Sequence, residues 1–394
     1  MIPRFRPTLF LSDLQILFEK KPSIEDFEKE FADFAGWKHS ILFPYGHAAA
    51  YSFYAANGVM EKEVIIPAYN CRVMLSAVIG SNNRPVFVDC EENGVNMDSK
   101  RAVSKINQNT GAICPTSMYG YPFDANAYRN ISDKVLILAD LAHCLFEDHA
   151  KSNRYDGIHA AIFSFGIGKQ TTMLGGGMLC TNDMDMYQKV KNYRDDNFKQ
   201  GTKKTFNVLF NFIAYRIFFS PLFYRLIYFL SEKTKLLNSL IGYDIGVVKI
   251  LPDDFLDMPT LFQIGLGLRQ FKRIQIVKEK RRAIINRYDM ALRYRRLKRM
   301  DLLPINTDCS HYPVFADERD ELHAFLASKG IHAMNIFNHP IYDLPIAKDL
   351  KDKDVYPNTE KITQRCLLLP LYDLMTEPEQ NHVIDSLLRW DNNG

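Results

Sequence analysis

The chain has 394 residues, 47% of them hydrophobic and 24% charged, and its 49 Lys and Arg nearly balance 46 Asp and Glu for a formal net charge of +3. This composition excludes a long disordered tail and a low-complexity fibre. The balanced charge gives no reason to expect nucleic acid as the main partner. The length predicts two or three domains. The aromatic content, with 27 Phe and 20 Tyr, is high.

The seven cysteines are scattered singly, without a C-x-x-C pair. This pattern argues against a disulfide framework and against a zinc site, so we expect no metal. A reducing cytoplasm is the simplest interpretation. The N-terminal segment carries Arg4 and Arg6, but Asp13 interrupts its apolar stretch and no small-residue cleavage site follows. We therefore expect no signal peptide.

The first half alternates between short apolar runs and helical patterns. The runs are rich in Val and Ile and span 63–67, 85–89, 135–140, 160–165 and 177–181. Such runs are typical of strands buried on both faces. Helical patterns lie between them, for example at 23–34 and 47–60. The alternation predicts a largely parallel sheet covered by helices on both faces. Because several strands end in a polar residue (Asp89, Asp140 or Ser164), we expect a ligand at the carboxyl edge of the sheet.

The segment 206–230 is the most apolar and aromatic stretch of the chain, and Arg216, Pro221 and Arg225 interrupt it. A membrane-spanning helix needs about 20 apolar residues, so the pattern favours two short helices broken at Pro221. Burial in the core or in an oligomer interface is the first interpretation. The alternative is that the segment lies flat on a membrane surface, with Arg216 and Arg225 reaching the headgroups.

A long helix is predicted from about Leu261, because Ile274, Val277, Ile284, Tyr288 and Leu292 share one helical face. It ends in the basic run 293–299, which is typical of a solvated helix end and alternatively could contact phosphate or an anionic membrane. Residues from 311 to the C-terminus mix strand-like pieces at 311–315 and 367–371 with a helix at 319–329. They indicate a smaller α/β domain. We therefore divide the chain into 1–250, with the insert 206–230, and 251–394.

Lys169 is the strongest candidate for chemistry. It follows a buried strand inside a glycine-rich segment that ends in Gly175-Gly-Gly177. Lysine avoids such places unless its amine is used or paired. Desolvation lowers the pKa of an amine and favours the neutral nucleophile that attacks an aldehyde. A phosphate contact is the alternative role for this lysine.

Two further elements accompany Lys169. Asp140 ends a predicted strand and could hold a protonated ring nitrogen, with His143 three residues on; a helix N-cap is the alternative for Asp140. The stretch 43–50, Phe-Pro-Tyr-Gly-His-Ala-Ala-Ala, turns at Gly46 into an Ala-rich helix. The free N–H groups at such a helix N-terminus bind phosphate. The alternative is an ordinary loop-to-helix turn, which has the same sequence pattern.

The three elements together meet the needs of pyridoxal 5'-phosphate: a lysine for its aldehyde, an anion for its ring nitrogen and a cradle for its phosphate. The order cradle, Asp, Lys resembles that of fold-type I pyridoxal enzymes. Over most of its length the chain resembles the DegT/DnrJ/EryC1/StrS family of sugar aminotransferases. The resemblance rests on six stretches: 28–36, 85–98 (the "PVFVD…NMD" segment), 140–143 (Asp-Leu-Ala-His), 164–177, and the C-terminal stretches 263–271 and 367–374.

The resemblance implies a fold-type I transferase: a large domain with a mostly parallel sheet and a smaller C-terminal α/β domain. It implies that Lys169 holds the aldehyde and shuttles the proton, and that Asp140 stabilises the pyridinium. It implies that His143 lies against the ring or near its phenolic oxygen. Ser164 and the turn at Gly46, with the N–H groups of His47 and Ala48, would hold the phosphate. The reaction would be transamination, commonly from glutamate, in a homodimer with shared sites.

The sequence departs from the family pattern at several positions. His47 replaces a usual threonine, and Cys71 stands where many members place an aromatic ring that stacks on the cofactor, a role for which Tyr69 is the substitute. Residues 256–259 replace a segment that reaches the neighbouring subunit, and the insert 206–230 has no counterpart in common members. Lys169 itself argues against the dehydratase branch, which has histidine there.

The predicted function is therefore a cytoplasmic, pyridoxal-phosphate-dependent aminotransferase. Its predicted substrate is a keto sugar, nucleotide-linked, in cell-surface polysaccharide or related biosynthesis. The second hypothesis keeps the reaction but uses a membrane-proximal or lipid-linked keto substrate, with the enzyme in peripheral membrane contact through 206–230. The third is a non-catalytic protein of the same fold. The keto compound, the carbon that is aminated and the pathway are not encoded in any recognisable motif.

Overall fold

The computed structural model describes residues 1–20, 22–131, 134–145, 155–200, 205–234, 250–293, 297 and 308–393. Seven strands form one sheet in the order β1-β7-β6-β5-β4-β2-β3, in which β7 alone runs antiparallel to its neighbours. The strands are β1 (His39–Phe43), β2 (Glu63–Pro67), β3 (Arg84–Val88), β4 (Thr110–Ile113), β5 (Leu136–Asp140), β6 (Ala160–Ser164) and β7 (Gly177–Thr181). The predicted, largely parallel sheet is confirmed.

All five predicted strands of this sheet are present, two with identical bounds and three shifted by one residue at an end. The sequence analysis did not predict β1 and β4. Both are short, and β4 carries only Ala112 and Ile113 as strong apolar signals. The two short helices predicted around Pro221 are confirmed as α6 (Thr205–Phe218) and α7 (Pro221–Thr234), and the long helix as α9 (Leu261–Leu292).

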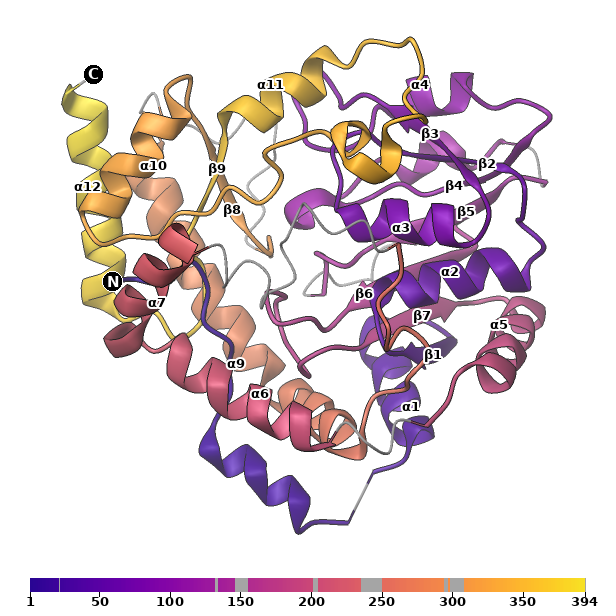
Figure 1. Ribbon diagram of the computed structural model, residues 1–394, viewed down its shortest axis with the longest axis horizontal. Coiled ribbons are helices and arrows are strands. Elements are labelled where there is room, and N and C mark those ends of the chain that lie inside the picture. Colours follow the sequence, from indigo (N-terminus) through magenta and orange to yellow (C-terminus); the bar gives the residue numbers. More distant parts are fainter. Residues whose placement is uncertain are drawn as a thin grey trace.

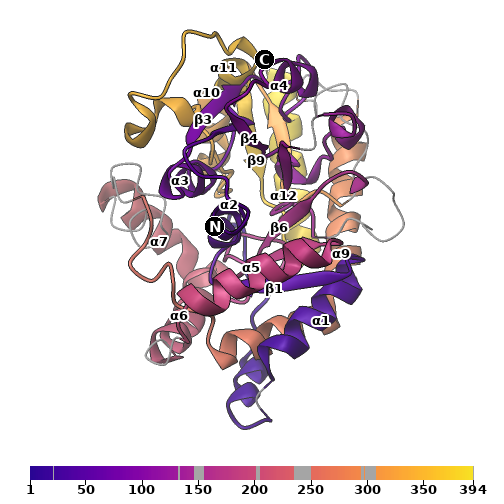
Figure 2. The ribbon, with the colours of Figure 1, turned by 90° about the vertical axis from the view of Figure 1, so that its right-hand side faces the viewer.

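Helices cover both faces of the sheet. Neighbouring strand residues point to opposite faces, so Phe163 and Ser164 of β6 mark the two sides. The ring of Phe163 packs edge-on against Phe31 of α1 (Ile24–Ala35), with centroids 5.1 Å apart. On the other side, Ser164 lies beside Gly46, the first residue of α2 (Gly46–Ala56). Figure 2 shows α1 and α5 (Met184–Asn197) on either side of the edge strand β1.

The remaining helices of the first half are short. They are η1 (Leu11–Leu17), α3 (Arg72–Gly80), α4 (Ser99–Ser104), η2 (Met118–Gly120) and η3 (Ala125–Tyr128). Ser23 caps α1 by accepting a hydrogen bond from the N–H of Asp26 at 3.0 Å, and the Asp26 carboxylate accepts one from the N–H of Ser23 at 3.1 Å. This reciprocal cap explains why the helix begins at residue 24, where the hydrophobic pattern predicts it.

The C-terminal part builds a second core around the antiparallel pair β8 (Tyr312–Phe315) and β9 (Cys366–Leu369). It contains α10 (Arg319–Ser328), η5 (Ile341–Asp343), η6 (Pro345–Ala347), α11 (Pro357–Arg365) and α12 (Glu377–Asn393). Helix α9 joins the two cores: Ile274 and Val277 pack in the first core, and Ile284 and Tyr288 in the second. The domain boundary at residue 250 stays a prediction, since 235–249 lie outside the described residues.

Asp89 does not contribute to the site that we expected at the carboxyl edge. Its carboxylate accepts hydrogen bonds from the backbone N–H groups of Asn358 (3.2 Å) and Thr359 (2.8 Å), in the first turn of α11. A carboxylate at a helix N-terminus is favourable, so Asp89 anchors α11 to the sheet. The basic run 293–299 lies mostly outside the described residues.

The N-terminal segment runs between two layers of helices (Figure 1). We call residues 4–9 the N-terminal strap. On one side, Gln270 of α9 donates a hydrogen bond to the carbonyl of Thr8 at 2.7 Å. On the other side, Phe5 stacks on Phe219, with centroids 4.5 Å apart, and Arg216 of α6 donates to the carbonyl of Leu9 at 2.6 Å. The strap is therefore held at a fixed place between α9 and the insert.

Candidate active site

Lys169 lies in a closed loop that links β6 to β7. The carbonyl of Phe165 accepts hydrogen bonds from the N–H groups of Met173 and Gly175 and from the hydroxyl of Thr172, at 3.1, 3.3 and 3.0 Å. The Lys169 N–H donates to the carbonyl of Gly166 at 3.1 Å. This loop places the lysine at the carboxyl edge of the sheet, just beyond β6, the strand that ends in Ser164.

The pKa of the Lys169 amine is lowered, chiefly because burial penalises its charged form. The charges of Cys71 and Asp140 act in the opposite direction, which also shows that both side chains lie near the amine. A lowered pKa increases the fraction of neutral amine at neutral pH. Lys169 is therefore suited both to nucleophilic attack on a carbonyl and to proton transfer.

Asp140 is buried at the end of β5, with an exposed fraction of 4%. Its carboxylate accepts hydrogen bonds from the N–H of Ala142 at 3.0 Å and from the hydroxyl of Thr116 at 3.5 Å. Burial raises its pKa, and the bond from Ala142 and the charge of Lys169 lower it. No helix begins at residues 141–145, so Asp140 is not the helix cap considered as its alternative. A buried carboxylate there is suited to hold a cationic partner.

His143 is held by the backbone of Tyr119, whose N–H donates to Nδ1 at 3.1 Å. Burial lowers the pKa of His143 well below its usual value, with Lys169 and His311 acting the same way. The neutral imidazole therefore carries its proton on Nε2. Tyr119 adopts a positive φ of 57° to make this contact, and its ring stacks parallel to that of His143 at 6.0 Å.

The predicted phosphate cradle is the N-terminus of α2, next to Ser164. Within the described chain, the His47 N–H and the Ser164 hydroxyl have no hydrogen-bond acceptor, whereas the Gly46 N–H faces the carbonyl of Gly176 in the parallel bridge between Tyr45 and Gly176. The structure differs from the expectation at Ala48, whose N–H donates to the carbonyl of Tyr45 at 3.1 Å. The available donors are therefore the His47 N–H and the Ser164 hydroxyl. Donors at a helix N-terminus favour an anion.

The His47 side chain packs among aromatic side chains and offers no polar group to the candidate site. Its ring lies 5.1 Å from that of Tyr45 and 5.3 Å from that of Phe255. Burial, together with the charge of Arg72, lowers its pKa to about 4. The residue thus packs the start of α2 as a neutral side chain, and its contribution to an anion site is its backbone N–H.

Tyr69 and Cys71 occupy different surroundings. The Tyr69 hydroxyl hydrogen-bonds to that of Tyr119, and its ring packs edge-on against Phe337 at 5.6 Å. Cys71 precedes α3, and its thiol senses the charges of Lys169 and Asp140. Cys71 therefore lies within electrostatic range of Lys169, while Tyr69 is linked to His143 through Tyr119.

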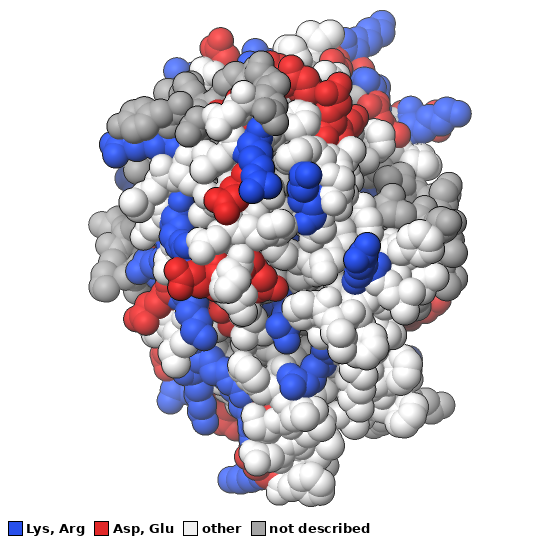
Figure 3. Space-filling view, turned by 90° about the vertical axis from the view of Figure 1, so that its left-hand side faces the viewer, with Lys and Arg blue, Asp and Glu red and all other residues white. Residues whose placement is uncertain are grey.

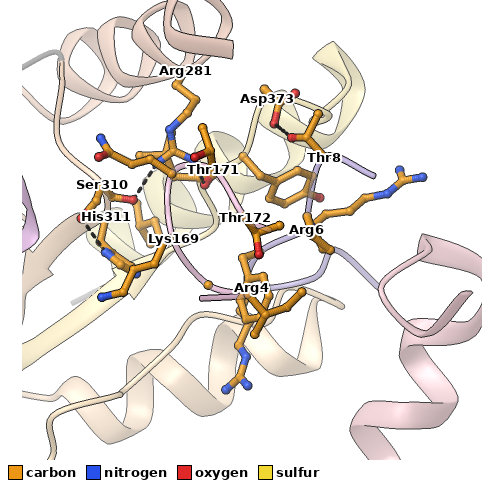
Figure 4. A pocket seen from close by; sticks show the side chains of 18 residues that line it. Arg4, Arg6, Thr8, Lys169, Thr171, Thr172, Arg281, Ser310, His311 and Asp373 are labelled. Atoms are coloured by element: carbon orange, nitrogen blue, oxygen red, sulfur yellow. Dashed lines mark hydrogen bonds between the residues drawn. The ribbon is translucent and has the colours of Figure 1, made fainter. Parts of the chain in front are cut away.

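The structure brings in residues that the sequence analysis missed. A cavity of about 30 Å³ beside Lys169 is lined by the N-terminal strap and by Arg281, His311 and Asp373 (Figure 4). His311 lies 5.1 Å from His143, ring to ring, and burial lowers its pKa to about 3. Arg281 donates to the carbonyls of Ser310 and Leu371 at 2.6 and 2.8 Å. No local motif marks these residues, because four segments far apart in the sequence supply them.

The residues present fit pyridoxal phosphate. Lys169 offers an amine of lowered pKa, and Asp140 offers a buried carboxylate. The His47 N–H at the start of α2 and the Ser164 hydroxyl are two donors without an acceptor in the described chain. When bound, the cofactor supplies an aldehyde that links to the amine and a pyridinium ring that accepts an electron pair from the substrate carbon. The chain would hold the ring nitrogen at Asp140, the phosphate at His47 and Ser164, and the transferred proton at Lys169 Nζ.

The sequence was compared with known families and curated proteins. The model of the DegT/DnrJ/EryC1/StrS aminotransferase family matches residues 14–217 and 260–388. The spore coat polysaccharide biosynthesis protein SpsC of Bacillus subtilis is 24% identical over 386 residues, covering 93% of this chain and 89% of that protein. The dTDP-3-amino-3,4,6-trideoxy-alpha-D-glucose transaminase of Streptomyces venezuelae is 23% identical, covering 94% and 87%.

Solved structures agree on the fold. Helicobacter pylori PseC, described as an aminotransferase of pseudaminic acid biosynthesis, superposes with a TM-score of 0.75 at 19% identity, covering all of both chains. The PMP form of Spr1654 from Streptococcus pneumoniae, a sugar aminotransferase by its description, superposes with a TM-score of 0.76 at 18% identity over the full length of both. At such identities the likeness establishes the architecture.

Proposed function

The chain belongs to the DegT/DnrJ/EryC1/StrS aminotransferase family and is a pyridoxal-phosphate-dependent aminotransferase, and from this premise we propose that it aminates a nucleotide-linked keto sugar with glutamate as the donor. The observation that carries the choice of substrate is the cationic lining of the cavity beside Lys169. Arg4, Arg6 and Arg281 line it, and the only carboxylate among its described lining residues, Asp373, accepts a hydrogen bond from Thr8.

The size of this cavity supports a substrate that extends outward. Its volume of about 30 Å³ is roughly that of two water molecules, so it encloses little beyond the reacting group. In Figure 4, Arg6 extends away from Lys169. A nucleotide-linked keto sugar matches this arrangement. Its keto carbon would lie near the Lys169 amine, and its diphosphate, one sugar ring further out, would lie near the Arg6 guanidinium. Guanidinium groups pair with phosphate oxygens in a fixed, bidentate geometry.

The relatives support the same substrate class. Curated relatives include the dTDP-sugar transaminase above and GDP-perosamine synthase of Escherichia coli O157:H7, which is 22% identical over 98% of this chain. SpsC is named for polysaccharide biosynthesis, which supports a polysaccharide context. A homodimer is predicted from the family resemblance and a cytoplasmic location from the scattered spacing of the cysteines, and both stay predictions.

The chain's own residues divide the reaction among them. Asp140 keeps its negative charge near the ring nitrogen, so the ring stays protonated and electron-accepting. Lys169, whose amine has a lowered pKa, would take the proton from the carbon that bears the amino group of the donor. It would then hand that proton back to the adjacent position of the reacting group. His143 offers its Nε2 proton from a fixed orientation. The intact set of Lys169, Asp140 and Ser164 disfavours the hypothesis of a non-catalytic protein.

The second candidate is the same reaction on a membrane-proximal or lipid-linked keto substrate. The observation that favours it is the apolar insert of α6 and α7, whose inner side holds the N-terminal strap against the cavity. A diphosphate bound to a lipid would meet the same cations. The two substrate classes therefore differ in what lies beyond the diphosphate.

The test is a screen of nucleotide-linked keto sugars with glutamate, read by transfer of labelled nitrogen to the sugar. We expect a visible cofactor band that borohydride shifts and fixes to Lys169, and amination of at least one nucleotide sugar. Lys169→Ala should lose both. Full transamination by Lys169→Ala would refute the mechanism, and amination of a lipid-linked keto sugar alone would select the second candidate.

A further inference from the structure

Helices α6 and α7 form a bent pair with two apolar faces. The helix axes change direction by 99° at the break before Pro221, and no single helix in the described part of the chain is long and apolar enough to cross a membrane. The segment 206–230 nevertheless contains seven Phe and three Tyr. A helix with one protein partner needs one apolar face, so the second face calls for an explanation.

The inner face of the pair packs against the protein. Val208 and Phe212 of α6 are buried with Leu9 of the N-terminal strap and with Phe262 and Leu266 of α9. Phe212 meets Phe262 edge-on at 5.8 Å between ring centroids. In α7 the hydroxyl of Tyr224 hydrogen-bonds to Nδ1 of His332 at 2.8 Å. These contacts fix the pair on the body of the molecule.

The outer face is equally apolar and faces solvent. We call it the outer stripe. Its members are Phe206, Phe210, Ile213 and Ile217 of α6 and Leu222, Leu226 and Phe229 of α7. On each helix they recur at intervals of three and four residues, which places them on one side, about half a turn from the inner face. Phe206 is 78% exposed and Leu222 is 81% exposed, whereas Phe212 is fully buried.

The sequence of the insert is poor in acidic residues. Between residues 197 and 231 it holds five Lys or Arg and neither Asp nor Glu, and the next acidic residue is Glu232 near the end of α7. Arg225 lies beside the stripe on α7 and is exposed. Figure 3 shows the side of the molecule on which α7 lies in Figure 1, and its lower right part is largely uncharged and broken by isolated Lys or Arg side chains. An apolar strip with a cationic border complements an anionic lipid surface.

We propose that the outer stripe is a membrane-binding surface: α6 and α7 lie in the interface of an anionic bilayer, with Arg225 at the headgroups. Burial of large apolar side chains among acyl chains supplies the binding, and anionic lipid strengthens it. The inner face of the same helices holds the N-terminal strap, so membrane binding places the wall of the Lys169 cavity next to the lipid. The membrane-binding surface does not depend on the proposed reaction. The significance of placing the Lys169 cavity next to the lipid does rest on the proposed function.

The test is co-sedimentation of the cofactor-loaded protein with vesicles of phosphatidylcholine alone and with 30–40% phosphatidylglycerol, a range chosen as roughly that of anionic membranes. We expect binding to the anionic vesicles and at least tenfold weaker partitioning of the variant Phe206→Ser/Phe210→Ser/Leu222→Ser/Leu226→Ser. A matched control carries Phe18→Ser/Ile276→Ser/Met290→Ser/Val355→Ser, four exposed apolar residues outside the insert. The control should bind like the parent chain.

Charge is tested separately. Arg225→Glu should weaken binding to anionic vesicles severalfold, and Lys100→Glu, an exposed cation elsewhere, should not. Thermal melting verifies that each variant is folded. Unchanged binding by the quadruple stripe variant, or no binding by the parent chain, overturns the proposal. The same holds if the variant only breaks an oligomer in solution, since the stripe is then an interface between copies of the chain. Lys169→Ala should still bind vesicles, so a failure of the proposed reaction is distinguishable.

Discussion

Gly177 lies directly against the backbone of Gly46. A Cβ at residue 177 would be 2.3 Å from the nitrogen of Gly46 and 2.4 Å from the carbonyl carbon of Tyr45. The first residue of β7 therefore packs directly against the first residue of α2, the helix whose N-terminus is the proposed phosphate cradle. This contact sets the distance between the lysine loop and the cradle, which belong to segments more than 100 residues apart.

Replacing Gly177 with Ala should displace the start of α2. Because the colliding atoms belong to the backbone, we expect a loss of about 3 kcal/mol in the free energy of unfolding and a large loss of cofactor affinity. Urea unfolding and the visible absorbance of the cofactor measure the two effects. Gly168→Ala is the matched control in the same loop, since its Cβ would meet only Phe5, at 4.0 Å. Equal stability of the two variants would contradict a close contact between residue 177 and the start of α2.

Replacing Asp140 with Asn should slow catalysis more than it weakens cofactor binding. The amide oxygen can still accept the bond from Ala142, but a neutral amide cannot balance a protonated ring nitrogen. We expect kcat to fall about 100-fold, which corresponds to about 2.7 kcal/mol in the activation barrier. Steady-state kinetics and cofactor titration measure both quantities. A kcat within threefold of the parent value would show that Asp140 does not act on the ring.

Arg6 should contribute to binding of the sugar substrate and not to the reaction with the amino donor. Loss of one guanidinium–phosphate contact removes about 1–2 kcal/mol, so Arg6→Ala should raise the KM for the nucleotide sugar about tenfold. The half-reaction with glutamate, followed by the cofactor spectrum, is the internal control and should be unchanged. If both half-reactions slow equally, Arg6 acts on the fold of the N-terminal strap instead.

His47 should make the protein sensitive to acid. Its pKa is lowered to about 4 by burial in the fold, whereas in the unfolded chain it is near 6.5. As pH falls below 6.5 the unfolded state takes up a proton that the folded state does not, so stability falls by about 1.4 kcal/mol per pH unit until about pH 4. His47→Gln should lessen this slope by that amount between pH 6 and 5. Urea unfolding at each pH measures it, and identical slopes would exclude His47.

A buried ion pair joins three elements near the edge of the sheet. Arg194 of α5 pairs with Glu28 of α1, and Glu28 also accepts the N–H of Leu42 in β1 at 2.7 Å. Arg194→Met should cost about 3 kcal/mol, because it leaves a buried carboxylate without its cation. Glu28→Gln/Arg194→Met should cost less than the sum of the single variants. Additive costs in urea unfolding would show that the two charges are not coupled.

The sequence predicted the sheet and the cofactor residues because their signals are local. A buried parallel strand is a short apolar run, and Asp140 and Ser164 end two such strands while Lys169 lies in the loop after the second, so chain order alone placed them at one edge. The strand β4 escaped prediction because its signal is two residues long. Asp89 shares the same signal as Asp140, and only the position of α11 shows that it binds a helix instead of a ligand.

The sequence by itself was therefore enough to identify the family, the fold and Lys169 as the candidate residue, since these are recognised from local patterns along the chain. The tertiary structure decided what surrounds the lysine. It brought Arg4, Arg281 and His311 to one cavity from three segments, and it turned Tyr69 toward Tyr119 and Cys71 toward Lys169. It also separated the aromatic insert into a buried face and an exposed one. Both are apolar in sequence, and only packing against the N-terminal strap and α9 distinguishes them.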